Sequence, residues 1–145
     1  MAVSVKVITL WRREVDNRPG ALARTLEPLA SAGADLKVLM GYRYPGDDGR
    51  AAIELYPVSG KKATAAAQAA GLAATSISAL LVQGENRAGQ AHAATRAIAD
   101  AGISLNFFLA QVIGKKYSAV LGFETEADAR RAAGLVKKAR ASKRA

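Results

Sequence analysis

Two short loops carry the residue types that could bind a small zwitterion. The first is Asn17-Arg18-Pro19-Gly20, preceded by Asp16, and the second is Asn86-Arg87-Ala88-Gly89, preceded by Glu85. If each loop leads into a helix, the free backbone N–H groups and the positive end of the helix dipole suit a carboxylate. The acidic side chain before each loop can accept hydrogen bonds from an ammonium group. This chemistry is recognition of an amino acid, not catalysis.

Single positions within the loops fit the same chemistry. Gly20 and Gly89 lack the side chain that would obstruct a ligand, and Asn17 and Asn86 offer both a donor and an acceptor. The residues of the two loops thus allow a binding site for an amino acid. A well-capped helix start is the open alternative, because Asp16 and Asn17 are good N-caps and Pro19 suits a first helical turn.

Both loops belong to an internal repeat. A shift of 69 residues places residues 17–38 on residues 86–107, with seven of the 22 positions identical. The segment Ala69-Ala70-Gly71-Leu72 returns as Ala132-Ala133-Gly134-Leu135 at a shift of 63, so the second copy is six residues shorter in between. An internal repeat of this kind predicts two similar modules, residues 1–72 and residues 73–145.

Each repeat shows the same order of strand and helix patterns. The first predicts strands over residues 3–11, 35–44 and 51–57, a helix after the loop that ends at Gly33, and a helix over residues 61–70 capped by Ser59. The second predicts strands over residues 77–83, 103–113 and 117–123, a helix over residues 91–101, and a last helix whose capping box is Thr125 with Asp128. Turn signals at residues 45–49 and 114–116 join the hairpins.

This order predicts an α+β fold. Each repeat reads strand-helix-strand-strand-helix, and right-handed crossovers then give a split βαβ topology, an antiparallel sheet with helices on one face. The strand that would complete each module comes once from residues 77–83 and otherwise only from the beginning of the chain. We therefore expect the two modules to share or exchange edge strands.

The loops and the segments that follow them resemble the signature of ACT domains, small ferredoxin-like βαββαβ modules that bind amino acids and regulate metabolic enzymes. The resemblance rests on residues 16–22 with Ala32-Gly33-Ala34-Asp35-Leu36, and on residues 85–89 with Ala101-Gly102-Ile103-Ser104-Leu105. It covers nearly the whole chain and implies a stand-alone tandem ACT pair. The second copy departs from the signature at Ala88 and Ala91, which leaves binding at that loop open.

The resemblance implies that the loops bind ligand, through Asp16, Asn17, Arg18, Pro19, Gly20, Ala21 and Leu22 in the first and Glu85, Asn86, Arg87, Gly89 and Gln90 in the second. It also implies where a ligand and partners would lie. ACT modules generally bind ligand where two modules meet, with the loop of one facing a strand of its neighbour. The candidate walls are then Leu39, Met40, Gly41, Phe108, Leu109 and Ala110, which could equally be sheet core. Gln90 and His92 could give the second loop a different pocket. The implied partners are an amino acid or related small carboxylate, a second copy of the chain in a homodimer, and a regulated enzyme or regulator.

Composition excludes several other classes. With 145 residues, 50% apolar and 23% charged, the chain is an ordinary globular one. It lacks a signal peptide, a run of about 20 apolar residues that could span a membrane, and any cysteine, so we expect a cytoplasmic protein. The lone His92 and the missing cysteine exclude the usual zinc and thiol sites, and the Gly-rich phosphate motifs are absent. We predict no enzyme, no cofactor and no metal.

The net charge of +9 keeps a nucleic-acid alternative open. Five of those charges fall within the last nine residues, and removing them leaves +4: Lys137, Lys138, Arg140, Lys143 and Arg144. A basic tail of this kind more often solubilises a chain than binds RNA, although RNA-recognition modules share the split βαβ topology. The stretch Lys115-Lys116-Tyr117-Ser118-Ala119-Val120-Leu121-Gly122 lacks the glycine and two of the aromatic residues of the RNA-binding consensus. A dimerisation module without ligand is the third alternative.

Overall fold

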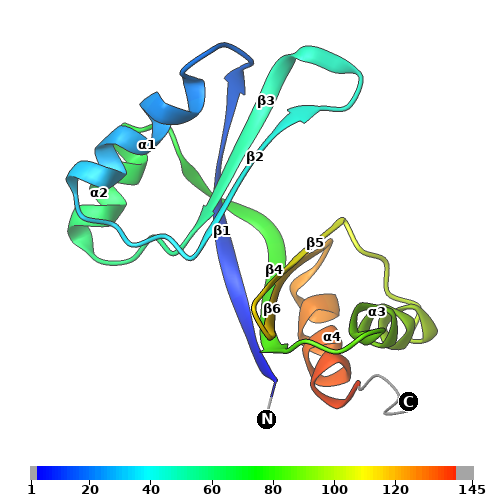
Figure 1. Cartoon of the computed structure of the whole chain (residues 1–145). Helices are drawn as coiled ribbons and strands as arrows, with labels where there is room; N and C mark the ends of the chain where they lie inside the picture. Colours follow the sequence, from blue (N-terminus) through cyan, green and yellow to red (C-terminus); the bar gives the residue numbers. More distant parts are fainter. Residues whose placement is uncertain (1–2, 140–145) are drawn as a thin grey trace. The chain divides into compact units, whose positions relative to one another are not determined.

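The structure, a computed structural model, describes residues 3–139 (Figure 1). In chain order the described elements are β1 (Ser4–Asp16), α1 (Ala21–Ser31), β2 (Val38–Tyr44), β3 (Asp47–Tyr56), α2 (Lys61–Ala69), β4 (Ala73–Glu85), α3 (Gln90–Asp100), β5 (Phe107–Ile113), β6 (Lys116–Phe123) and α4 (Glu126–Lys138). The predicted order of strand, helix, strand, strand and helix in each repeat is confirmed, and the sheets are antiparallel.

The chain forms two compact units. One unit is Thr9–Thr75, and the other joins the described residues up to Ile8 with those from Ser76 onward. The first residues of β1 thus go with the second repeat, while the rest of β1 goes with the first. The division after Thr75 lies close to the repeat boundary at residues 72 and 73.

Within Thr9–Thr75 the strand order is β2-β3-β1. Trp11 lies opposite Leu55 and Val15 opposite Ala51, and these four residues belong to the apolar core beneath the helices. Leu29 of α1 and Ala67 of α2 pack into the same core and are almost fully buried. Both helices therefore cover one face of this sheet, as the sequence predicts.

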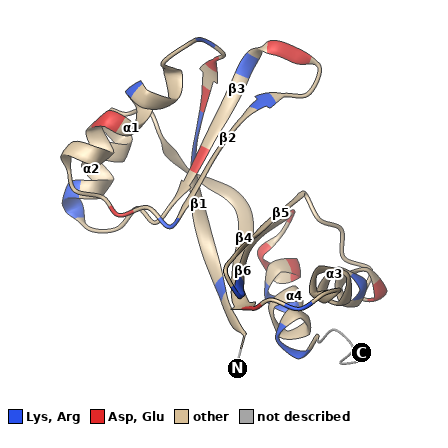
Figure 2. Ribbon diagram, in the orientation of Figure 1, with Lys and Arg blue, Asp and Glu red and all other residues tan. Residues whose placement is uncertain are grey.

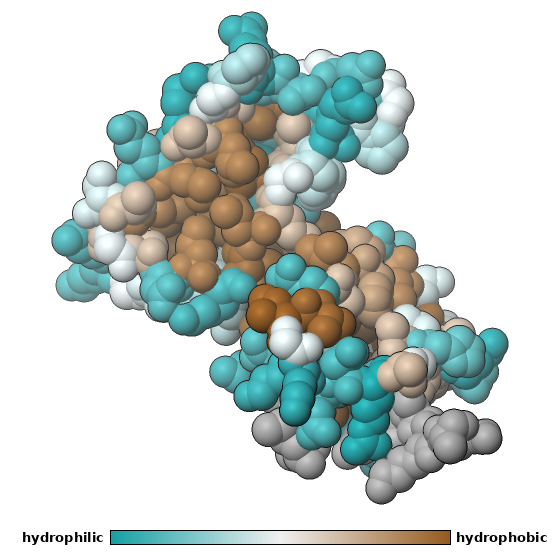
Figure 3. Space-filling view, viewed as in Figure 1, coloured by the Kyte–Doolittle hydropathy of each residue, from teal (hydrophilic) through white to brown (hydrophobic). Residues whose placement is uncertain are grey.

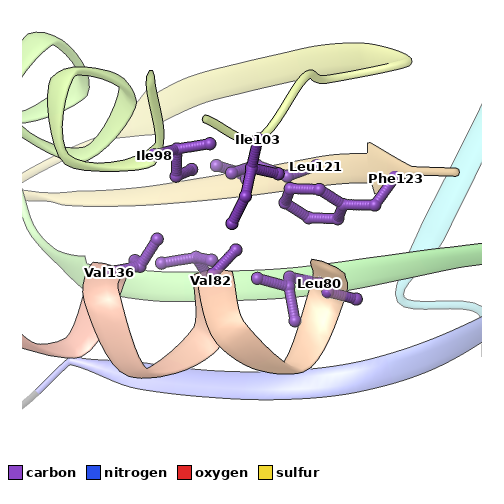
Figure 4. Packing of buried hydrophobic residues seen from close by; sticks show 10 residues of the cluster. Leu80, Val82, Ile98, Ile103, Leu121, Phe123 and Val136 are labelled. Atoms are coloured by element: carbon purple, nitrogen blue, oxygen red, sulfur yellow. The ribbon is translucent and has the colours of Figure 1, made fainter. Parts of the chain in front are cut away.

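The other unit repeats this arrangement with the strand order β4-β6-β5. Its core joins Leu80 and Val82 of β4, Leu121 and Phe123 of β6, and Val136 of α4 (Figure 4). Val3 and Val5, partly buried, pack against this core, which explains why the first residues of the chain belong to this unit.

β1 extends further than predicted. The sequence places the end of this strand at Trp11, before a charged run, but the strand continues to Asp16. Arg12 lies opposite Glu54 and Asp16 opposite Arg50. Pairs of opposite charge across adjacent strands are stabilising, so the charged residues extend the strand instead of ending it.

Two predicted N-caps are wrong and one is confirmed. Gly20 is the N-cap of α1 in place of Asp16 or Asn17, and Gly60 is the N-cap of α2 in place of Ser59, both without a side-chain cap hydrogen bond. Pro19 precedes the first helical turn instead of entering it. At α4 the Thr125 hydroxyl accepts a hydrogen bond from the Asp128 N–H at 3.1 Å, as predicted.

The remaining boundaries differ by a few residues. β2 begins at Val38 and β5 at Phe107, later than predicted, and β3 begins at Asp47 because the turn between β2 and β3 takes only Pro45 and Gly46. Lys137 and Lys138 belong to the last turn of α4, whereas Arg140, Lys143 and Arg144 lie outside the described residues. Among residues 3–139, no helix has the length and apolar character to cross a membrane.

Candidate functional site

The two predicted loops have the same backbone geometry. The N–H of Asn17 donates to the Gly49 carbonyl at 2.9 Å, and the N–H of Asn86 donates to the Lys115 carbonyl at 2.8 Å. Gly20 and Gly89 both take the left-handed conformation, with φ of 85° and 82°. Each loop is therefore tied to the hairpin beside it, and each turns into its helix at a glycine.

The Asn17 side chain also holds the first loop in place. Its Nδ2 donates to the Asp48 carbonyl at 2.9 Å, and the asparagine forms no cap hydrogen bond to α1. A left-handed backbone at Gly20 directs the chain into the helix without a side-chain cap. The alternative that Asp16 or Asn17 caps α1 is thereby excluded.

The first loop borders a cleft of about 600 Å³ between α1 and the β2–β3 hairpin. Gly41, one of the predicted walls, lines the cleft. Six of the seven residues predicted for the loop line it as well: Asp16, Asn17, Arg18, Gly20, Ala21 and Leu22. Apolar side chains reach the surface between α1 and β2 (Figure 3). The Leu22 side chain lies over Gly41: its Cδ2 is 3.7 Å from the position that a Cβ atom at Gly41 would occupy. The cleft thus combines a polar end at the loop with an apolar interior.

Charged side chains surround the polar end of this cleft. Arg50 Nη1 donates to Asp16 Oδ1 at 2.9 Å, and Arg18 Nη2 lies 3.8 Å from Asp16 Oδ2. The bond to Asp16 is the main reason that the pKa of Arg50 is raised. Arg43 on β2 also lines the cleft and pairs with Asp48 at 3.8 Å, at the acidic start of β3 (Figure 2). A carboxylate and two exposed guanidinium groups therefore stand at one end of the cleft.

Arg43 and Tyr42 are cleft residues that sequence reasoning missed. The Tyr42 hydroxyl donates to Glu54 Oε2 at 2.6 Å, and Glu54 is only 2% exposed. Burial, followed by the hydrogen bond and the charge of Glu54, raises the pKa of Tyr42. Both residues fall within the predicted strand 35–44, next to Gly41, but they belong to no recognisable sequence motif. Their position beside α1 follows only from the fold.

The second loop is arranged differently. Glu85 and Asn86 line a hollow of about 530 Å³ with Gly114, Lys115 and Lys116. Asn86 and Gln90 also line a separate apolar cavity of about 100 Å³, together with the predicted walls Phe108 and Ala110. Gln90 is buried, and its Nε2 donates to the Ala139 carbonyl at 3.1 Å at the end of α4. The two repeats have therefore diverged at corresponding positions.

The remaining predicted residues line none of these three hollows. They are Pro19 and Arg87 and Gly89 of the loops, the wall candidates Leu39, Met40 and Leu109, and His92. Gly89 instead sets the start of α3, while Leu39 and Leu109 are half-exposed. Within residues 3–139, no group of three or more histidine or acidic side chains is placed to hold a metal ion.

Comparison with solved structures establishes the kind of fold. A structure from Bacteroides thetaiotaomicron matches with a TM-score of 0.73 at 13% identity, covering 88% of this chain and 87% of its own. The ligand-free regulatory subunit of aspartate kinase from Thermus thermophilus matches with a TM-score of 0.65 at 16% identity, covering 97% and 99%. The corresponding subunit from Thermus flavus gives a TM-score of 0.56 at 16% identity, covering 94% and 97%.

Comparison by sequence adds nothing to this result. No protein-family model matches the chain, and no curated protein matches it. The structural likeness shows that both repeats have the ACT-like ferredoxin fold that the sequence predicts.

Proposed function

We propose that this protein is a non-catalytic regulatory protein that binds an amino acid, or a related small carboxylate, in the cleft beside the loop Asp16–Leu22. The observation that carries the proposal is the convergence of six predicted loop residues and Gly41 on one cleft of about 600 Å³. A volume of this size falls within the range of small-molecule sites in proteins.

The side chains around the cleft match the two charges of an amino acid. Arg18 and Arg43 can donate charge-assisted hydrogen bonds to the α-carboxylate. Asp16 can accept from the α-ammonium through Oδ2, since Oδ1 accepts from Arg50. The ligand side chain would then lie against the apolar wall that Leu22 and Gly41 form.

Partners follow from the same proposal. The Thermus proteins with this fold are regulatory subunits of aspartate kinase. By analogy we propose that the present chain works with a regulated enzyme or regulator, as a homodimer. Amino-acid binding would favour one conformation of the assembly and so shift its population.

A thermal-shift screen of the twenty amino acids tests the proposal. A ligand that binds only the folded chain stabilises it by about 2.7 kcal/mol at a hundredfold excess over its dissociation constant. We expect one or two amino acids to raise the melting temperature selectively. If none does, the proposal fails; salt-sensitive retention of RNA by the same protein would then favour the nucleic-acid alternative.

Filling the cleft tests its location. Gly41→Val adds a branched side chain at the wall of the cleft, and the Cβ itself makes only ordinary contacts with Leu22. We expect this variant to lose at least tenfold in affinity for the amino acid found in the screen. Gly49→Val is the matched control, because Gly49 lies on the same hairpin but outside the cleft. Full affinity in Gly41→Val would place the ligand elsewhere.

A further inference from the structure

We propose a second binding site, separate from the cleft at the first loop: the cavity of about 100 Å³ beneath α3 takes a branched aliphatic group about the size of a leucine side chain. This site lies within the unit that contains β4, β5 and β6 and shares no residue with the cleft. It would operate whether or not the first loop binds an amino acid.

The cavity has an apolar floor and an accessible rim. Val82, Ala119, Leu121 and Val136 form the buried apolar part of its lining, and the one buried polar residue among the lining residues, Gln90, donates its side-chain amide to the Ala139 carbonyl at 3.1 Å. The rim is exposed and includes Ala91 at the start of α3, Ala110 on β5 and the side chain of Asn86. A ligand can therefore enter beside Ala91 with an apolar end, while its polar end stays at the rim.

The two repeats explain why this cavity exists. Ala91 corresponds to Leu22 in the first repeat, at the shift of 69 residues. The Leu22 side chain covers Gly41, and in the second repeat Ala91 and Ala110 replace these two residues. Gly84 corresponds to Val15 at the same shift, and their strand partners are Tyr117 and Ala51. Two residues further along these partner strands, Ala119 therefore corresponds to Ile53. At two positions, then, the second repeat has lost a branched aliphatic side chain.

The second repeat has also replaced two polar side chains of the first by apolar ones at this cavity. In the first repeat Arg13 Nη1 donates to the Thr25 hydroxyl at 3.0 Å, and that hydroxyl donates to the Ala21 carbonyl at 2.9 Å. Val82 and Ala94 occupy the corresponding positions of the second repeat, and both line the cavity. A small cavity lined by apolar groups stays dry and favours an apolar occupant over water.

Volume sets the size of that occupant. An engineered apolar cavity of about 150 Å³ binds benzene, so about 100 Å³ suits a group of about four carbons, such as isobutyl. Such a group could belong to an aliphatic amino acid or to a short branched carboxylate. The two sources share the aliphatic group and differ only in the ammonium at the polar end.

Isovalerate and L-leucine distinguish these sources by NMR titration of the ¹⁵N-labelled full chain, with acetate as the control that has no aliphatic group. We expect isovalerate to shift the amides of Ala91, Ala94 and Ala119 saturably, and acetate to leave them unchanged. Equal shifts with L-leucine would assign the site to aliphatic amino acids, and shifts with isovalerate alone would assign it to carboxylates. No saturable shift with either compound would overturn the proposal.

Filling the cavity is the second arm of the experiment. Ala91→Leu restores the residue of the first repeat and should reduce isovalerate affinity at least tenfold while raising the melting temperature. Ala99→Leu adds the same group at an exposed alanine of α3 that does not line the cavity, and should bind isovalerate as the parent does. Gly41→Val should also bind isovalerate normally, which separates failure at this site from failure at the cleft. Full isovalerate affinity in Ala91→Leu would overturn the assignment.

Discussion

A network of arginine, carboxylate and tyrosine side chains joins β1, β2 and β3 next to the first loop. Arg12 Nη1 donates to Glu14 Oε2 at 2.7 Å, and its Nη2 donates to the Tyr44 hydroxyl at 2.7 Å. The Arg12 guanidinium carbon also lies 5.7 Å from the centre of the Tyr44 ring, a cation–π distance. Arg50 bridges Glu14 and Asp16 at 3.4 and 2.9 Å. Asp16 thus reaches the cleft already oriented by the network.

Glu14 makes this network sensitive to acid. The pKa of Glu14 falls from 4.5 to about 2, chiefly through the hydrogen bond from Arg12 and next through Tyr44. A pKa that is lower in the folded state contributes stability above the unfolded value of 4.5, and this contribution is lost as the pH falls towards 2. We expect Glu14→Gln to be less stable than the parent at pH 7, with a difference that narrows between pH 4.5 and pH 2. Urea denaturation of both proteins at several pH values measures the difference in unfolding free energy. A difference that does not change with pH would contradict a lowered pKa for Glu14.

Tyr42 supports a buried carboxylate. Its hydroxyl donates to Glu54 Oε2, Arg12 Nε lies 3.9 Å from the same oxygen, and Oε1 has no hydrogen-bond partner within residues 3–139. Removing the hydroxyl leaves a buried carboxylate poorly satisfied, so Tyr42→Phe should cost about 2 kcal/mol of folding free energy. The double variant Tyr42→Phe with Glu54→Gln should cost less than the sum of the two single changes. Strict additivity in urea denaturation would show that the two side chains do not interact.

At the scale of elements, glycines set the starts of three helices. Gly89 has a φ of 82°, where a side chain is strained, so Gly89→Ala should destabilise the chain by about 1 kcal/mol. Gly134 lies within α4, and a Cβ there would meet no atom within 4 Å. Gly134→Ala should therefore stabilise the chain by about 0.5–1 kcal/mol. Urea denaturation measures the change in unfolding free energy of each variant. If both variants were destabilised, or both stabilised, the different backbone conformations of Gly89 and Gly134 would not explain their effects.

These glycines also show what the sequence could and could not predict about elements. The cap at Thr125 was predictable because a threonine followed by Asp128 places a hydroxyl and an N–H within reach in any helix. Asp16 and Asn17 have the same local signal at α1, but cross-strand pairing with Arg50 and a bond to Asp48 engage them instead. That competition depends on residues more than 30 positions away, so local patterns could not reveal it.

At the scale of the whole molecule, β5 is the exposed edge strand that would pair in the proposed homodimer. It contains no charged residue, and Leu109, Val112 and Ile113 are 49%, 53% and 72% exposed, with apolar groups at the surface over this strand (Figure 3). A long apolar edge strand without charge favours pairing with another chain. β2, the other edge strand, carries Arg43, which disfavours such pairing.

We therefore expect a dimer that depends on β5. Leu109→Lys places a charge on this edge and should shift the mass measured by light scattering from dimer to monomer. Leu39→Lys makes the same change on β2, where the side chain is 43% exposed, and should leave the dimer intact. A dimer that survives Leu109→Lys, or a parent chain that is monomeric, would contradict the role of β5.

The repeat made the overall fold predictable, but not the sites within it. Identical residues at a fixed shift imply that both halves fold alike, and both do. The ACT resemblance names Gly41 as a wall, but as a wall that faces the loop of a neighbouring module; in the structure Gly41 lies beside the loop of its own unit. For the cavity beneath α3, the sequence named four lining residues, Asn86, Gln90, Phe108 and Ala110. Its space could not be predicted, because it arises from side chains that are missing at Ala91 and Ala119, on elements distant in sequence. Packing across elements decides such features.

NMR mapping of the amino acid identified in the thermal screen tests the central claim most directly. The account predicts saturable shifts at the amides of Asp16–Leu22 and Gly41–Arg43, with the corresponding amides of Gly41→Val unchanged at the same concentration. Shifts confined to other residues, or binding that persists in Gly41→Val, would contradict a site at the first loop.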